Sequence, residues 1–400
     1  MDWIKILEKI GAVSRETKIL PENEKMESLE QEESHLSQDN ETDIPENVEL
    51  GLTEREGLPE ATEHTLLLCR EQVEQKGEDF YLVQKDSSQL LMGVFDGCGG
   101  SGAKVYPQFA SQTGARVASR TLAEAVKEWF SVIQVRKNPN EAAEETEVKP
   151  ERTAEETTAT MQEMEETPEQ KLQKSMEQKL KECREAVQAG QLLLGSLKKE
   201  FPSTMVLFTV ETEEQTTQAD FFWCGDSRGY VLDMAGLHQV TKDDVAITDA
   251  MENLREDAPM TNVANASVPF VVHRKSIELK KPSLLIAATD GCFGYLPSPM
   301  EFEKLLLQTM NVSENMEQWK SELEKEIEKV AGDDFTLAIW NGMFGSFQEM
   351  KDSFRQRQQY MEEKYPLEEK TTEEMLSIQW REYKTSYESL MDAGEVKHGN

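Results

Sequence analysis

Short apolar runs bounded by polar turns recur along the middle of the chain and predict a sheet-rich domain. Residues 80–85 and the apolar run over 89–95 are expected to form two adjacent antiparallel strands, joined by a turn at residues 86–88. Similar runs predict strands at residues 204–210, 220–224, 229–232, 284–289 and 335–340. The sequence Gly225-Asp226-Ser227-Arg228 is expected to make a hairpin turn closed by an Asp226–Arg228 ion pair.

Helical spacing of apolar residues appears between these strands. A helix is expected over residues 102–135, with Pro107 interrupting it early. A second helix is expected over 172–197, where Leu172, Met176 and Leu180 share one face. Shorter helices are expected at residues 299–308 and 314–330, whereas residues 242–268 are polar and irregular in pattern.

Both ends of the chain carry amphipathic patterns outside this core. Trp3, Ile6 and Ile10 follow helical spacing within residues 1–13. In the tail, one amphipathic helix is expected over residues 347–361, and a heptad-like stripe of apolar residues follows over 376–390. Each segment is expected to pack on its own domain, with binding of a protein partner as the open alternative.

Charge divides the chain into unequal parts. Of a net charge of −34, much lies in residues 22–60, with fourteen acidic and two basic residues, and in residues 141–170, with eleven acidic and two basic residues. Such stretches are predicted to be disordered linkers. The expected division is a short N-terminal segment (1–19), an acidic linker (20–64), a domain (65–342) with an acidic insertion (137–170), and a helical C-terminal extension (343–400). Because phosphate backbones would be repelled, nucleic-acid binding is excluded.

Cysteine usage and hydropathy indicate a cytoplasmic protein. The five cysteines show no CxxC spacing, which is typical of reduced thiols and argues against a disulfide framework or a zinc site. No run of eighteen apolar residues occurs, so no transmembrane segment is expected.

Carboxylates stand at the ends of four predicted strands. Asp96-Gly97 follows one apolar run, Asp290-Gly291 closes another, Asp333 precedes a third, and Glu78-Asp79 precedes a fourth. Each carboxylate alone is compatible with a helix cap or a turn. Gathered by one sheet, they would form the oxygen-rich cluster that Mg²⁺ or Mn²⁺ prefers, and two such ions can activate water.

Six short motifs follow the order found in the metal-dependent serine/threonine protein phosphatases, the PP2C or PPM family. They are Glu78-Asp79, Asp96-Gly97-Cys98-Gly99-Gly100, Pro202-Ser203-Thr204, Gly225-Asp226-Ser227-Arg228, Asp290-Gly291 and Asp333-Asp334-Phe335-Thr336. Over residues of about 65 to 342 the chain therefore resembles this family. The resemblance implies an α+β fold, in which two antiparallel sheets flanked by helices form a four-layer α-β-β-α sandwich.

The resemblance also implies a site for two Mg²⁺ or Mn²⁺ ions. In this family the aspartate of the first Asp-Gly motif bridges both ions and the next glycine gives its carbonyl oxygen, which assigns Asp96 and Gly97. By the same likeness Asp290 and Asp333 bind one ion, and the Glu78-Asp79 pair holds metal-bound waters. A water between the ions would attack phosphorus, and Asp79 and Asp96 would be the catalytic carboxylates.

Some positions depart from the family pattern. Cys98 stands where the family has the histidine assigned as the acid for the leaving group, and a buried thiol is a poor substitute. Glu74 occupies the place of the phosphate-binding arginine, which leaves Arg70 or Lys76 as candidates for that contact. Lys199 replaces an aspartate that helps a third metal in some members.

The sequence therefore predicts a phosphatase that acts on phosphoserine and phosphothreonine in phosphoprotein substrates. The alternative is a catalytically impaired pseudophosphatase that serves as a protein-binding module. Retention of Asp96, Asp290 and Asp333 favours the enzyme, whereas the missing histidine and arginine favour the module. The segment 241–281 matches the family's flap beside the substrate, but no substrate-binding residue is assigned.

Overall fold

The computed structural model describes residues 62–86, 89–137, 166–188, 199–212, 216–256, 258–368 and 370–391. The expected N-terminal amphipathic segment, nearly all of the acidic linker and residues 138–165 of the acidic insertion lie outside these described residues. The predictions for those segments therefore remain predictions.

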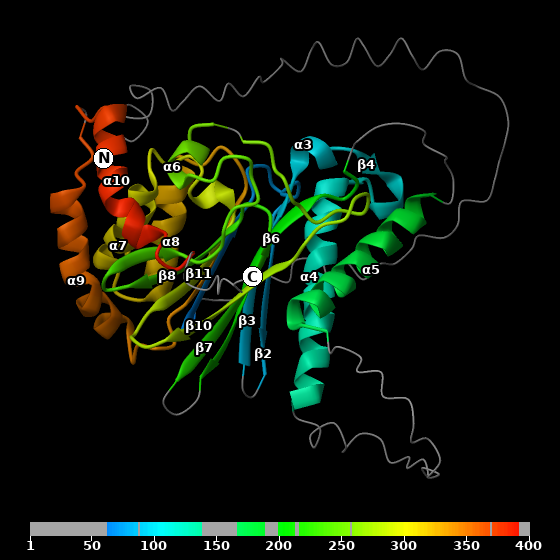
Figure 1. Ribbon diagram of the computed structural model, residues 1–400, viewed down its shortest axis with the longest axis horizontal. Helices are drawn as coiled ribbons and strands as arrows, with labels where there is room; N and C mark the ends of the chain where they lie inside the picture. Colours follow the sequence, from blue (N-terminus) through cyan, green and yellow to red (C-terminus); the bar gives the residue numbers. More distant parts are fainter. Residues whose placement is uncertain are drawn as a thin grey trace, which may run out of the picture.

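The described part of the chain forms two five-stranded antiparallel sheets that pack face to face (Figure 1). In spatial order, the first sheet contains β1 (Thr65–Arg70), β12 (Phe335–Trp340), β11 (Leu284–Ala288), β8 (Arg228–Asp233) and β9 (Gly236–Gln239). The second contains β10 (His273–Leu279), β7 (Thr217–Cys224), β6 (Ser203–Thr212), β3 (Gln89–Gly97) and β2 (Phe80–Lys85). A short ribbon of β4 (Val105–Tyr106) and β5 (Gln112–Thr113) lies apart from both.

Helices cover the outer face of each sheet. On the second sheet, α4 (Gly114–Lys137) packs against β2, β3 and β6, and α5 (Pro168–Gln188) packs against α4. On the first sheet, α8 (Met316–Glu328) packs against β1 and against α7 (Pro299–Val312). The predicted four-layer α-β-β-α sandwich is confirmed (Figure 1).

Central strands are apolar throughout because both of their faces are buried. On β11, Leu284 and Ile286 face the helices α7 and α8, while Leu285 and Ala287 face the other sheet. Successive side chains of a strand point to opposite faces, so a strand between two packed layers reads as a continuous apolar run. This explains why the sequence marks β11 and β12 so clearly.

The single helix expected over residues 102–135 is wrong in its first third. The structure has α3 (Gly99–Gly102), β4, the 3-10 turn η2 (Pro107–Phe109) and β5 before α4 begins at Gly114. Pro107 and two left-handed residues, Ala110 (φ 52°) and Ser111 (φ 57°), prevent a helix here. Strands β1, β9 and β10 are additions, and β10 lies inside the flap-like segment 241–281.

Two C-terminal helices complete the layer outside the first sheet. α9 (Phe347–Lys364) packs on α7, and α10 (Glu373–Tyr387) packs on β9 and α7 (Figure 1). The heptad-like stripe is buried, with Leu376, Trp380, Tyr383 and Tyr387 all at most 4% exposed. The expectation that the tail packs on its own domain is confirmed for these helices.

A buried glutamate joins these C-terminal helices to α7. The Glu303 carboxylate of α7 is fully buried and accepts hydrogen bonds from Arg357 Nε at 2.6 Å and Nη2 at 3.0 Å. Tyr383 of α10 donates its hydroxyl to the same carboxylate, and the backbone N–H of Leu237 donates at 3.2 Å. A buried charge is tolerated only when it is paired in this way. The network therefore fixes α9, α10 and β9 around one point.

We expect Phe354→Ala to destabilise the whole domain. Phe354 on α9 is 1% exposed and belongs to the same core cluster as α7 and α8. Its loss should lower the free energy of unfolding by about 3 kcal/mol, the usual scale for emptying a phenylalanine site. Urea unfolding measures this, with Ile378→Ala on the exposed face of α10 as the control. A fall no larger than the control's would mean that α9 unfolds separately from the domain.

His238 should make the docking of α10 depend on pH. Its ring nitrogens lie 2.7 Å from the Ser386 carbonyl oxygen and 3.2 Å from the Asp233 carboxylate. Burial acts to lower the pKa of His238, but these two contacts outweigh it and leave the pKa raised above 6.5. A raised pKa stabilises the folded state fully below about pH 6.5, and this contribution is lost as the pH rises through the folded-state value.

The matching substitution is His238→Gln. It should therefore lower the free energy of unfolding more at pH 6 than at pH 9, as measured by urea titration at both values. An equal loss at the two values would show that the protonated ring contributes nothing to the docking.

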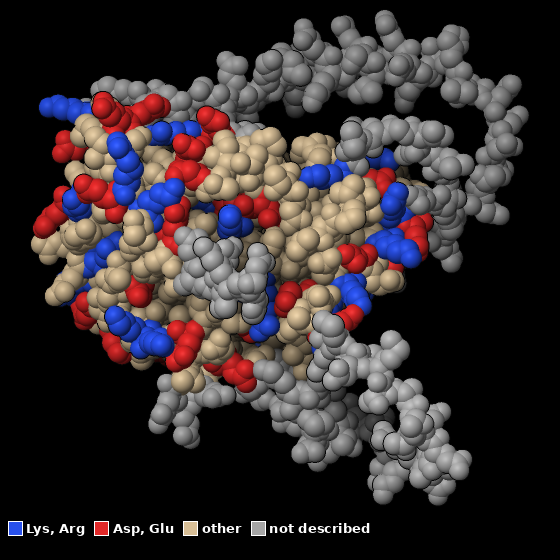
Figure 2. Space-filling model, in the orientation of Figure 1, with Lys and Arg blue, Asp and Glu red and all other residues tan. Residues whose placement is uncertain are grey.

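The described surface carries mixed charges and no membrane span. Figure 2 shows acidic and basic side chains interspersed over the visible face, in keeping with an ordinary balance outside the acidic segments. No helix among the described residues combines the length and apolar character needed to cross a bilayer.

Candidate metal centre

Strand ends bring the predicted carboxylates to one end of the sandwich. Asp96 lies at the end of β3, Asp79 directly before β2, Asp290 two residues after the end of β11, and Asp333 two residues before β12. Burial raises the pKa of Asp96 well above its usual range, and the charges of Asp79, Asp290, Asp226 and Asp333 raise it further. These carboxylates therefore lie within electrostatic reach of one another.

Asp79 is the most buried member of the group. Its side chain is 2% exposed, and its Oδ2 accepts a hydrogen bond from the Thr289 hydroxyl at 2.9 Å. Burial raises the pKa of Asp79 well above its usual range, and the charges of Asp334 and Asp290 add to the effect. Thr289 directly precedes Asp290, so this hydrogen bond ties the start of β2 to the end of β11.

Glu78 lies beside the first turn of α4. Its Oε1 accepts a hydrogen bond from the Thr113 hydroxyl at 2.5 Å. Burial raises the pKa of Glu78, although the Thr113 bond opposes the change. Arg116 lies close enough to Glu78 to lower its pKa and also forms an ion pair with Glu71 at 3.4 Å. The sequence analysis did not single out Arg116, because it lies in a helix and outside the motifs.

The two neighbouring aspartates before β12 have different roles in the structure. Asp334 accepts backbone hydrogen bonds from Gln72 at 2.7 Å and from Glu78 at 2.6 Å, and so holds the β1–β2 loop. Asp333 is exposed and accepts from the Asp334 backbone N–H at 2.8 Å. Asp333 is therefore the one of the two whose carboxylate is placed at the surface of the cluster.

Two glycines allow the close approach of these segments. A Cβ on Gly97 would lie 2.4 Å from the Ala115 carbonyl oxygen, at the start of α4. A Cβ on Gly291 would lie 2.0 Å from the Asp334 carbonyl oxygen. Contacts this short exclude any side chain, which explains the glycine after each aspartate. Asp96 and Asp290 owe their positions to the backbones packed against the next residue.

The structure adds Asp226 to the cluster and corrects its expected partner. Arg228 does not pair with Asp226: its Nε and Nη2 donate to the Asp243 carboxylate, at 2.9 and 2.7 Å. Burial, Asp290 and Asp243 raise the pKa of Asp226 to about 8. Its buried Oδ1 has no hydrogen-bond partner among the described residues. The sequence left Asp226 as a turn residue because Asp243 is distant along the chain.

The sequence of this chain matches one known protein family. The family model described as "Protein phosphatase 2C" matches residues 70–328, which is more than half of the chain. The chain belongs to the protein phosphatase 2C family. No curated protein matches its sequence.

Solved phosphatase structures resemble this member of the 2C family at low identity. The catalytic domain of the serine/threonine phosphatase PstP, in complex with two manganese ions, is 15% identical, with 69% of this chain and 96% of that chain covered and a TM-score of 0.41. A serine/threonine phosphatase from Staphylococcus aureus is 17% identical (72% and 98% covered, TM-score 0.46). RsbX in complex with magnesium is 14% identical (70% and 96% covered, TM-score 0.39).

The clustered side chains of this 2C-family chain carry oxygen atoms of the kind that bind divalent cations. All of the clustered side chains offer carboxylate oxygens, which Mg²⁺ and Mn²⁺ prefer. Burial and neighbouring acidic groups raise the pKa values of Asp79, Asp96 and Asp226, and the buried Oδ1 of Asp226 has no hydrogen-bond donor among the described residues. A cation among them would relieve both conditions. Within the described residues, no three His, Cys, Asp or Glu side chains already form a ligand set.

Cys98 keeps its proton in this environment. Burial raises the pKa of the thiol well above its usual range, and the charge of Asp96 raises it further. Of the positions considered for phosphate contact, Arg70 forms ion pairs with Glu328 at 3.0 Å and Glu324 at 3.9 Å. The candidate site thus has neither the family's histidine nor a free Arg70 beside it.

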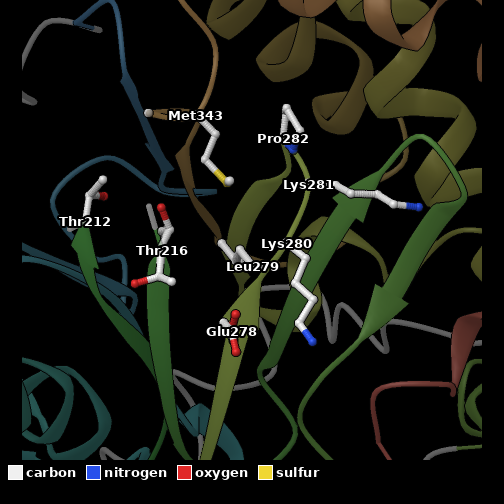
Figure 3. Close-up of a pocket in the computed structure, with 10 residues that line it drawn as sticks. Thr212, Thr216, Glu278, Leu279, Lys280, Lys281, Pro282 and Met343 are labelled. Carbon is white, nitrogen blue, oxygen red and sulfur yellow. The ribbon is translucent and has the colours of Figure 1, made fainter. Parts of the chain in front are cut away.

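Two pockets lie at opposite ends of the sandwich. A pocket of about 50 Å³ borders the acidic cluster, and its lining includes Asp226, Asp290, Arg228, Asp243, Asn253 and Phe293. A wider one, of about 410 Å³, lies between the β6–β7 and β10–β11 connections and includes Thr212, Lys280 and Met343 (Figure 3). Only the smaller pocket adjoins residues that the family motifs mark.

Proposed function

We propose that this protein is a metal-dependent phosphatase that hydrolyses phosphoserine and phosphothreonine in proteins. The proposal is supported by one observation above all. In this chain of the 2C family, the charge of Asp290 raises the pKa values of three other carboxylates, those of Asp79, Asp96 and Asp226. Such repulsion is costly in a fold unless cations occupy the site.

In this proposal each side chain has a definite task. Asp96, Asp290, Asp333 and the Gly97 carbonyl hold Mg²⁺ or Mn²⁺ directly, while Glu78 and Asp79 hold water molecules around the ions. When bound, two such ions supply a water of lowered pKa as the nucleophile and neutralise the phosphoryl oxygens. Thr289 keeps Asp79 in place through its 2.9 Å hydrogen bond. Asp226, which the sequence predicts only as a turn residue, supplies a further carboxylate.

Protonation of the leaving oxygen is the least supported step of the proposed reaction. The seryl or threonyl oxygen requires a proton, and a thiol with a raised pKa donates one poorly. We therefore propose slow turnover, with water as the proton donor in place of the family's histidine. The substrate side of the site includes no assigned residue.

The test is metal-dependent hydrolysis of a phosphopeptide and of p-nitrophenyl phosphate by the full chain. Wild-type protein should release phosphate with Mn²⁺ and should not with excess chelator. Asp290→Asn should lower turnover by about 10²–10³-fold. Asp352→Asn, an exposed aspartate on α9, is the matched control and should retain full activity. Wild-type protein without metal-dependent turnover would refute the proposal.

A second candidate function is a protein-binding module without turnover. It is favoured by the protonated Cys98 and by Glu74, which is exposed and acidic where the family has an arginine. A module of this kind would still bind Mn²⁺ and would bind phosphopeptide without hydrolysing it. Phosphopeptide binding measured beside turnover separates the two functions.

We also propose a division of labour along the chain. Residues 65–342 carry the chemistry in the cytoplasm, and the acidic segments 20–64 and 137–170 act as linkers around it. The C-terminal residues 343–400 are proposed to stabilise the domain rather than to form a separate unit, because α9 and α10 share its core.

A further inference from the structure

α10 contacts the segment that borders the candidate site. The helix lies beside α6 (Ala250–Asn253), far from it in sequence (Figure 1). Asp249 caps α6 by accepting from the backbone N–H groups of Met251 at 2.9 Å and Glu252 at 3.0 Å. The same carboxylate accepts from Trp380 Nε1 at 3.1 Å and from Lys384 Nζ at 2.6 Å, both on α10. One side chain therefore caps α6 and anchors α10.

A second connection runs through Tyr387 at the end of α10. Tyr387 is 1% exposed; burial raises the pKa of its hydroxyl, and the Arg228 guanidinium lies close enough to oppose that rise. Arg228 is itself buried, donates to Asp243 through Nε and Nη2, and stacks on Phe293 with its guanidinium carbon 4.3 Å from the ring centroid. Tyr387 therefore helps to hold the guanidinium in its paired position.

Both connections meet at the small pocket beside the acidic cluster. Asn253 of α6 donates to the Asp243 carboxylate at 3.1 Å, which joins α6 to the Arg228–Asp243 pair. Arg228, Asp243 and Asn253 line that pocket together with Asp226 and Asp290. The contacts of α10 therefore reach side chains that line the same pocket as the carboxylates of Asp226 and Asp290.

We propose that α10 is a positioning element for the metal centre, with Tyr387 and the Asp249 anchor as its positioning residues. Held on Asp243, the Arg228 guanidinium forms no hydrogen bond with Asp226, whose buried Oδ1 has no partner among the described residues. Released, it would bring its positive charge closer to the carboxylates and compete with the divalent cation. The inference concerns metal affinity and deepens the proposed function, on which its link to turnover rests.

The test compares two positions on the same helix in the full chain. Tyr387→Phe removes the hydroxyl beside Arg228, and Ile378→Ala shortens an exposed side chain of α10 as the control. Amide hydrogen exchange of residues 243–256 should accelerate in Tyr387→Phe and not in Ile378→Ala. Mn²⁺ affinity, measured calorimetrically without substrate, should fall about 10-fold in Tyr387→Phe, the scale seen when a group supporting metal ligands is lost. In Ile378→Ala it should change less than twofold.

A second pair of variants tests the Asp249 anchor. Trp380→Phe removes one donor to Asp249 and keeps an aromatic ring, and it should likewise accelerate exchange over residues 249–253. Lys384→Met removes the other donor and should do the same.

Equal exchange and equal Mn²⁺ affinity in Tyr387→Phe and Ile378→Ala would overturn the positioning role. Altered exchange over 243–256 in a protein that shows no metal-dependent turnover would instead support it and refute the proposed function alone. The two failures are thus distinguishable.

Discussion

Asp96→Asn is expected to lower turnover by about 10³-fold and, in the metal-free protein, to raise the melting temperature. The first effect follows because Asp96 is one of the carboxylates that would hold the divalent cations, and loss of such electrostatic support lowers turnover on this scale. The second follows from its raised pKa, which reflects burial and four neighbouring acidic groups. An acid whose pKa is raised in the folded state lowers stability at every pH above its unfolded-state pKa, so replacing it with a neutral amide removes that cost at pH 8.

The two effects of Asp96→Asn are measured separately. Initial rates with Mn²⁺ report the loss of turnover, and thermal unfolding in excess chelator reports stability. Asp352→Asn, on the exposed side of α9, should change neither. If the metal-free Asp96→Asn protein melts below wild type, the carboxylates do not repel one another as described, and the main support for the metal centre is lost.

Cys98→His is expected to increase turnover by about 10²-fold, at the low end of what a positioned general acid contributes. The position follows Asp96 directly, and burial and the neighbouring charges keep the thiol protonated. Those same negative charges would raise the pKa of an imidazole and favour its protonated form, which is able to supply a proton to the leaving oxygen. The gain should appear in kcat for the phosphopeptide.

Two substrates with different leaving groups test whether the gain in kcat comes from proton donation. The gain should be smaller for p-nitrophenyl phosphate, whose leaving oxygen needs no proton. Cys98→Ser is the control, since a hydroxyl is no better as an acid than the thiol, and it should leave kcat near the wild-type value. A Cys98→His protein with unchanged kcat would show that proton donation is not what limits the wild-type chain.

The strands whose bounds the sequence predicts correctly are those with runs of apolar residues. β2 and β12 have the predicted bounds, because β2 opens with the apolar run Phe80 to Val83 and every residue of β12 is buried. β10 was missed because its residues alternate between intermediate and exposed positions up to Leu279, and only pairing with β7 holds it as a strand. The early part of the 102–135 helix failed because Ala110 and Ser111 adopt left-handed backbone conformations that their side chains do not signal.

The candidate site likewise contains some residues that the sequence marks and others that it does not. The carboxylates that end strands were recognisable, because an apolar run followed by Asp-Gly marks both the strand and its end. Asp226 was not, because its role depends on Arg228 pairing with Asp243, fifteen residues beyond the arginine. The Asp249 contacts with α10 span more than 130 residues and could not be read from local pattern.

The shared core of α7, α9 and α10 ties the function of this chain to the order of its synthesis. A nascent chain that has reached residue 342 already contains every carboxylate assigned to the metal centre. It still lacks Arg357 and Tyr383, without which the buried Glu303 of α7 loses its pairing. The domain should therefore mature only after its last helices leave the ribosome, and a chain halted earlier should be a substrate for proteolysis rather than a small phosphatase.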